Sequence, residues 1–372
     1  MKINHRQLSI MVFMSFIALK LLALPSLLYK ESGNMSWLVA LVLMTIDAIY
    51  AYLIIELMKR SNEKNIYEFM KKTLGIVLTK IFMFLLMLKF LLVVGNIIKD
   101  LEFFVVENLY NKFDWVLFIF PLIAVVGFLM YKGLRNIGRV YEMFFIAIII
   151  GCVYIGIKAL NGIDWLSFLP MFKDGARPLL KSSYIHLGWF GSSSFLIMFF
   201  GKVDFKNEKK SRLIKYMVLA ILLVQFLYIV FFGLYGRTSS IHNFALSDIS
   251  QYYSGISSTD EISWLVVSLW IVAQAVQIAM YAYCLMLSIM FTFNIKNKIV
   301  PIIIIDILMF LLGYVSEKTI NLENIFFTDF SSIITIVTQY VLPLFLLLGY
   351  IVQNRKQKVV NNEKVKKSIQ ST

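Results

Sequence analysis

Apolar stretches of membrane-spanning length follow one another along the whole chain, separated by short polar segments. A helix needs about 20 apolar residues to cross the hydrocarbon core of a bilayer. With 59% hydrophobic residues and a mean hydropathy of +0.77, these 372 residues carry more apolar surface than a water-soluble domain could bury. We therefore expect an all-α integral membrane protein. Ten membrane helices are predicted, near 8–28, 36–58, 75–98, 115–131, 140–158, 184–201, 213–235, 263–293, 299–315 and 333–352.

Lysine and arginine gather in alternate loops between these spans. If the N-terminus is cytoplasmic, 24 of the 36 basic residues lie in cytoplasmic segments and 9 lie in outer loops. Because cytoplasmic loops of membrane proteins are enriched in Lys and Arg, we expect both termini to be cytoplasmic. The net charge of +14 does not indicate nucleic-acid binding, since the basic residues alternate with apolar spans. We expect one permease-like domain over residues 1–355 and a disordered basic tail over 356–372.

The sixth predicted span contains a segment that is poorly suited to a continuous helix. Gly188–Ser194 holds two glycines and three serines within seven residues. Glycine weakens a helix, and serine competes for its backbone hydrogen bonds. Backbone groups freed inside a membrane need partners from protein, water or a ligand, so a break here is expected to line a cavity. The alternative is that the small residues let a neighbouring helix pack closely.

The first span carries its own interruption, Ala18–Pro25, in which Pro25 cannot donate to the helical ladder. Ten helices can form two units of five, a first repeat over about 8–158 and a second over about 184–352. An odd number of helices inverts the second unit, so the first and sixth helices correspond. Breaks at corresponding positions predict an inverted-repeat transporter fold with a ligand site near the membrane midplane. The ligand-binding candidates from the two breaks are Ala18, Leu19, Lys20, Leu21, Pro25, Gly188, Trp189, Gly191, Ser192 and Ser193.

Four charged residues lie near the middle of predicted spans, where an ionisable group is costly unless it is paired or hydrated. Lys20 and Asp47 lie at similar depths, so an ion pair is expected, either at the ligand site or as a simple tie between two helices. Lys89 and Asp306 are further candidates for charge pairing or for lining a cavity.

The eighth span places Gln274, Gln277 and Tyr281 on one helix face, at spacings of i, i+3 and i+7. They could donate hydrogen bonds to a ligand or to neighbouring helices. The two cysteines and three histidines have no metal-ligand spacing, and no catalytic constellation is recognised. We therefore expect neither an enzyme nor a metal or other cofactor.

Several stretches together resemble one family. They are Ile3–Leu8 before a span ending in Leu24 and Pro25, Gly33–Trp37, Lys132–Glu142, Leu169 and Pro170 followed by Asp174–Leu180, and Pro343–Arg355. In this order and spacing they resemble the endospore germination permeases, the B-subunits of spore nutrient-germinant receptors in the amino acid–polyamine–organocation superfamily.

This resemblance implies a LeuT-like 5+5 inverted repeat with broken helices 1 and 6, embedded in the lipid of the spore inner membrane. It also implies an A-subunit and a lipoprotein C-subunit as partners, and a small germinant such as an amino acid bound between helices 1 and 6. The chain departs from the family at Ala18 and Lys20, where small residues are usual, and at Ser192, where a glutamate is common. The alternative function is a proton-coupled amino-acid permease that transports its ligand.

Overall fold

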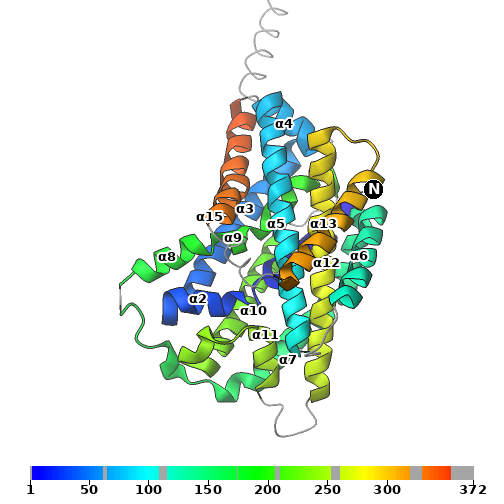
Figure 1. Ribbon diagram of the computed structural model, residues 1–372. Coiled ribbons are helices and arrows are strands. Elements are labelled where there is room, and N and C mark those ends of the chain that lie inside the picture. Colours follow the sequence, from blue (N-terminus) through cyan, green and yellow to red (C-terminus); the bar gives the residue numbers. More distant parts are fainter. Residues whose placement is uncertain are drawn as a thin grey trace, which may run out of the picture.

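Helices form nearly all of the regular structure (Figure 1). The computed structural model describes residues 2–61, 65–108, 115–173, 175–205, 210–252, 260–318 and 329–352, so the predicted tail at 356–372 lies outside the described residues. The α-helices are α1 (His5–Ala18), α2 (Leu24–Ser32), α3 (Ser36–Ser61), α4 (Ile66–Leu74), α5 (Ile76–Asn108), α6 (Trp115–Lys132), α7 (Leu134–Ala159), α8 (Arg177–Ile185), α9 (Leu187–Phe190), α10 (Lys210–Tyr235), α11 (Ala245–Gln251), α12 (Asp260–Phe293), α13 (Ile299–Lys318) and α15 (Asp329–Thr335). The 3-10 segments are η1 (Gly33–Met35), η2 (Leu160–Gly162), η3 (Trp165–Phe168), η4 (Gly191–Phe199) and η5 (Gly236–Ser240), and η7 (Ile336–Val341) is π-helical. Two-residue strands β1 (Ile3–Asn4) and β2 (Val203–Asp204) pair in parallel.

The described residues contain six helices that are long and apolar enough to cross a membrane, and three shorter apolar helices at Val116–Lys132, Leu187–Phe199 and Ile299–Val315. The prediction of an all-α, multi-pass membrane protein is confirmed. The number of ten crossings stays a prediction. The six long helices are Leu24–Ser61, Ile76–Glu107, Leu134–Gly162, Ser211–Ser240, Trp264–Phe293 and Phe330–Val352.

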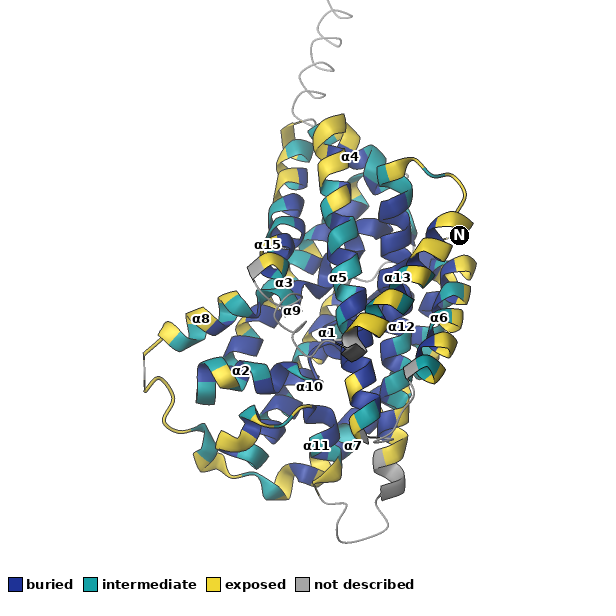
Figure 2. Ribbon diagram, viewed as in Figure 1, coloured by how far each residue is buried: buried dark blue, intermediate teal, exposed yellow. Residues whose placement is uncertain are grey.

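The buried interior lies where α1, α10, α5, α7 and α12 pack against one another. Figure 2 shows buried residues concentrated in these central helices, while the outer faces of α6 and α13 are largely exposed. The exposed side chains on these outer faces are large and apolar, for example Leu117 and Phe128 on α6 and Ile303 and Ile307 on α13. An apolar exterior around a core that contains charged side chains is the arrangement that lipid surroundings require.

The first predicted span is interrupted between Ala18, where α1 ends, and Leu24, where α2 begins. Pro25 lies in the first turn of α2, where its missing N–H is no loss. It therefore begins the second segment. The sixth predicted span is divided into α8, α9 and η4. The 3-10 segment η4 has nine residues, well beyond the three or four that are usual for this tight helix.

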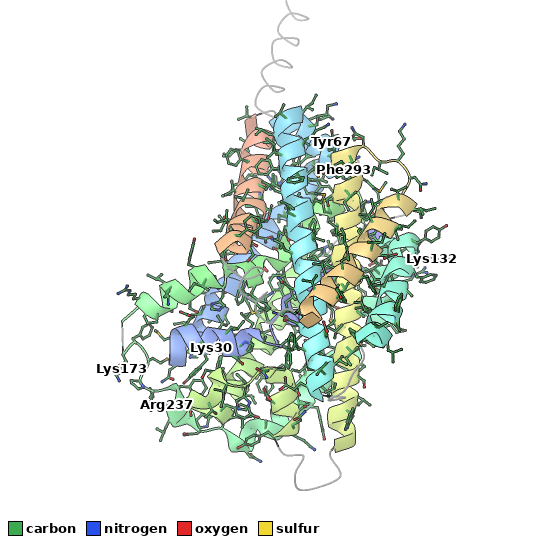
Figure 3. All side chains as sticks on the ribbon, viewed as in Figure 1. Lys30, Tyr67, Lys132, Lys173, Arg237 and Phe293 are labelled. Atoms are coloured by element: carbon green, nitrogen blue, oxygen red, sulfur yellow. The ribbon has the colours of Figure 1, made fainter. Side chains whose placement is uncertain are left out.

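The two ends of the helical bundle differ in how they are closed. In Figure 3, Tyr67 and Phe293 label one end, and Lys30, Lys173 and Arg237 label the other. At the former end β1 pairs with β2, and Gln7 Nε2 donates a 3.0 Å hydrogen bond to Glu142 Oε2. These contacts tie the start of the chain to α7 and to the segment after η4.

Candidate functional site

The break between α1 and α2 frees backbone carbonyls deep inside the protein, and four of them are satisfied by other elements. Two accept from side chains of α12 and α10, and two accept from backbone N–H groups at the start of α11. A broken helix inside a membrane protein requires such partners. The bonds are Gln274 Nε2 to the Ala18 carbonyl (2.6 Å), Tyr228 Oη to that of Lys20 (2.6 Å), Leu246 N to that of Leu21 (3.1 Å) and Ala245 N to that of Leu22 (3.3 Å).

The break between α9 and η4 is satisfied in a similar way. The Gly191 carbonyl accepts from Lys89 Nζ at 3.1 Å and from Ser194 Oγ at 2.9 Å, and the Ser192 carbonyl accepts from Tyr281 Oη at 3.0 Å. A Cβ at Gly191 would lie 2.5 Å from Thr335 Cγ2 and 2.7 Å from Lys89 Nζ. Gly191 is therefore required for the close approach of the lysine to this segment.

Between the two breaks lies a set of polar side chains that we call the buried charge cluster: Lys20, Asp47, Lys89, Ser192, Ser193 and Gln339. Lys20 Nζ donates to Ser192 Oγ at 2.8 Å, and Ser192 Oγ donates to Asp47 Oδ2 at 2.7 Å. The expected pairing of Lys20 with Asp47 is therefore made through a serine hydroxyl and not by direct contact. The Lys20 ammonium also lies over the rings of Phe16 and Phe190, at 5.6 and 5.4 Å from their centroids.

The second carboxylate oxygen of Asp47 is equally well bonded. It accepts from Ser193 N at 3.3 Å, from Gln339 Nε2 at 2.8 Å and from Ser193 Oγ. Asp47 is completely buried, so these bonds replace its hydration. With Ser192 included, the carboxylate has four donors, which is close to its full acceptor capacity.

Gln339 is a member of the cluster that we did not predict from the sequence. It lies in η7, a π-helical turn within the last apolar helix. Single π-helical turns inside α-helices occur frequently at functional sites. A glutamine within a predicted apolar span was the signal that could have identified it.

The polar face of α12 is directed toward the same region, but its bonds go to protein groups. Gln274 bonds the Ala18 carbonyl, Tyr281 bonds the Ser192 carbonyl, and Gln277 Oε1 accepts from Tyr141 Oη. In the described part of the chain, Gln274 Oε1 and Gln277 Nε2 have no hydrogen-bond partner. Each glutamine thus bonds to another protein group through one polar atom of its amide, and its other polar atom has no partner among the described residues.

Asp306 is separated from the other predicted residues. It lies on α13 against Gly127 of α6, where an added Cβ would be 3.0 Å from Asp306 Oδ2. Its Oδ1 has no hydrogen-bond partner among the described residues. The structure therefore does not bring Asp306 to the buried charge cluster with Lys89.

A cavity of about 450 Å³, which we call the vestibule, lies at the end of the bundle where α2 and α8 pack side by side. Its walls come from the end of the first break, from α2, α5 and α9, and from the segment after η5, and they include Ala23, Ser26, Trp189, Phe103, His242 and Asn243. The volume is in the range of small-molecule sites. Charged residues of both signs line it: Lys30, Lys99, Glu31, Asp100 and Glu107.

The vestibule and the buried charge cluster are adjacent through consecutive residues. Trp189 lines the vestibule, and the next residue, Phe190, lies over the Lys20 ammonium. Trp189 is 6% exposed and Phe190 is fully buried. A solute in the vestibule would therefore be one aromatic layer from the cluster.

Comparison with known proteins adds an independent finding. A family model described as spore germination protein matches residues 2–321. Spore germination protein KB of Bacillus subtilis (strain 168) is 24% identical over 218 residues, which cover 57% of this chain and 58% of that protein. The aligned region thus spans a little more than half of that relative.

Proposed function

We propose a function from one premise: this chain belongs to the spore germination protein family. It is therefore a multi-pass membrane protein of a family that is associated with spore germination. We propose that it is a membrane subunit of a spore germinant receptor. It binds a small nutrient germinant, such as an amino acid, between the two interrupted segments, and binding triggers germination.

The proposed architecture is a LeuT-like 5+5 inverted repeat of ten helices, with helices 1 and 6 broken, in a single domain over residues 1–355. Its proposed location is the spore inner membrane, with both termini cytoplasmic and with an A-subunit and a lipoprotein C-subunit as partners. The supporting observation is that the two interrupted segments meet, since Lys20 of the first donates to Ser192 of the second. Inverted-repeat transporters place their ligand sites at such junctions.

A germinant would enter through the vestibule, whose wall includes Ala23 beside the first break and Trp189 beside the second. A bound solute can shift the protein only if it binds one of two states more tightly. A germinant that contacts both breaks at once meets this condition. If the distance between the breaks differs between the two states, the germinant fits one state better than the other. The response would then pass to the bundle through Ser192, which bonds both Lys20 and Asp47.

A nutrient panel tests this proposal on spores that lack the chain and on spores that regain it. The variants Lys20→Ala and Ser192→Glu are each expected to change the germinant concentration for half-maximal response by about tenfold or more, equal to about 1.4 kcal/mol. Lys80→Ala is the matched control, because Lys80 is an exposed lysine on α5. If both variants insert into the membrane and respond like the parent, the germinant binds elsewhere.

The alternative function is a proton-coupled amino-acid permease. One observation favours it: Lys20, Ser192 and Asp47 form a continuous chain of hydrogen bonds between two ionisable groups. Uptake of labelled amino acids by the purified chain in proteoliposomes distinguishes the two functions. Sustained, proton-dependent uptake would contradict a pure receptor role, and its absence beside a germination response would favour one.

A further inference from the structure

A second, much smaller cavity lies beside the buried charge cluster, between α5, the segment at Gly188 and α15. It has a volume of about 20 Å³, and its wall includes Lys89, Asn96, Gly188 and Thr335. A cavity needs about 10–15 Å³ to hold one water-sized particle. This side cavity therefore has room for a single water molecule or a monatomic ion, and it is too small for a nutrient.

Lys89 lines this cavity, and its ammonium has hydrogen-bonding capacity that the described residues leave unused. Lys89 is 2% exposed, and an ammonium has three N–H donors. In the described part of the chain, its one hydrogen-bond acceptor is the Gly191 carbonyl, at 3.1 Å. A buried charge with so few partners is costly in a protein interior.

Among the residues that the structure describes, the charges around Lys89 do not balance. Lys20 and Lys89 contribute two ammonium groups, and Asp47 is the carboxylate that interacts with both. Asp47 already accepts from Ser192, Ser193 and Gln339. One positive charge is therefore left over, and Lys89 is the one that borders a cavity.

We propose that the side cavity is a binding site for a small monovalent anion of the size of chloride. Lys89 Nζ supplies the charge, and Asn96 supplies its amide. Asn96 Oδ1 is buried without a hydrogen-bond partner in the described structure. A 180° rotation of the side-chain amide puts its NH₂ group where Oδ1 now lies, so that Asn96 can donate to an anion. The anion neutralises the remaining ammonium and so stabilises the junction of α5 with the second break. This site is separate from the proposed germinant site, and its test involves no nutrient.

Bromide is a direct probe, because its anomalous scattering locates it in crystals of the full chain. The expected result is an anomalous peak in the side cavity, next to Lys89 Nζ. Bromide peaks that occur elsewhere, with none in this cavity, would overturn the proposal. The same negative result would be obtained if Lys89 were neutral and the cavity held water.

Thermal unfolding of the purified chain gives a second, independent measurement. Replacing gluconate by chloride at about ten times its Kd should raise Tm by about 2 °C, because a ligand that binds the folded state stabilises it. Lys89→Met should abolish this shift, whereas Lys80→Met, which removes an exposed charge from the same helix, should keep it. Equal shifts in the two variants would contradict the site.

Asn96→Asp provides a test that does not depend on losing stability. Aspartate has the shape of asparagine, and its carboxylate would place a negative charge that is covalently part of the chain beside Lys89. This variant should no longer respond to chloride, yet it should keep the Tm that the parent has in chloride. A chloride response like that of the parent would count against the proposal.

Discussion

Ser192 Oγ donates a 2.7 Å hydrogen bond to Asp47 Oδ2, and this bond joins η4 to the middle of α3 in the fully buried interior. The same hydroxyl accepts from Lys20 at 2.8 Å. One small side chain therefore connects both interrupted segments to α3. The predictions below concern this junction and the vestibule beside it.

Asp47→Asn should destabilise the protein strongly. It removes the carboxylate that interacts with the buried ammonium groups of Lys20 and Lys89, and leaving buried charges without their counter-charge costs about 3–5 kcal/mol. The measurement is the Tm of the purified chain in detergent. Glu56→Gln is the control on the same helix, since Glu56 pairs with the exposed Arg60 and such pairs contribute below about 1 kcal/mol.

The variant Lys20→Met, combined with Asp47→Asn, refines this test. If the two charges stabilise each other through Ser192, the double variant should lose less stability than the two single variants together. Additive losses would show that the two side chains contribute independently.

Gly191→Ala should disturb the second break. The new methyl group would collide with Thr335 Cγ2 and Lys89 Nζ, and overpacking of this kind costs about 1–3 kcal/mol. Gly151→Ala is the control, because its Cβ would meet Val266 at an ordinary 3.5 Å. Adding Thr335→Ser removes one of the colliding groups and should recover part of the loss in Tm. No recovery would assign the strain to Lys89 alone.

Tyr228→Phe should weaken the first break. It deletes the 2.6 Å bond to the Lys20 carbonyl and leaves that buried acceptor without a donor, at a cost of about 1–3 kcal/mol. Tyr184→Phe, at an exposed position on α8, is the control for the loss of a hydroxyl. Equal Tm values for the two variants would mean that this carbonyl finds another partner.

The free energy of unfolding should fall as the pH rises through about 6. The group that titrates is Asp248 in α11, which lies outside the membrane-spanning helices. Burial, helped by the nearby Glu107 carboxylate, raises the pKa of Asp248 from 3.8 to about 6, although His242 opposes the shift. The folded state then binds the proton more tightly than the unfolded chain, so this stabilisation is complete below about pH 4 and is lost as the pH passes 6.

Asp248→Asn tests the assignment. Tm measured between about pH 4 and about pH 7 should decline less steeply in this variant than in the parent. Asp164→Asn, at the exposed residue that caps the start of η3, is the companion variant. A profile for Asp248→Asn that matches the parent would place the titrating group elsewhere.

Filling the vestibule should block the germination response without unfolding the protein. Ala23→Phe adds a ring to its wall, and the germinant concentration for half-maximal response should rise by about tenfold or more. Ile241→Phe adds a ring of the same size to an exposed position nearby and should respond like the parent. An unchanged response of Ala23→Phe would exclude the vestibule as the route of entry.

Local chain chemistry was sufficient to predict the membrane class, the approximate places of the helices and the two helix breaks. These properties depend on the length of apolar stretches and on intrinsic helix preference, which neighbouring residues determine. Lys20, Asp47 and Lys89 could be singled out because a charge inside an apolar span is conspicuous. The helix ends were less predictable: α5 extends to Asn108, about ten residues beyond the predicted span, because packing inside the protein extends it.

The partners of these residues depend on packing between distant segments, which no local pattern contains. Gln339 reaches Asp47 across 292 positions, and Ser192 reaches it across 145. The backbone of α11, which supplies two donors to the first break, has no sequence signature for that role. Asp306, with the same intramembrane signal as Asp47, packs against α6 and away from the buried charge cluster. Composition identifies a costly buried charge, whereas the rotation and depth of each helix, set by the packing of all the others, decide which group compensates it.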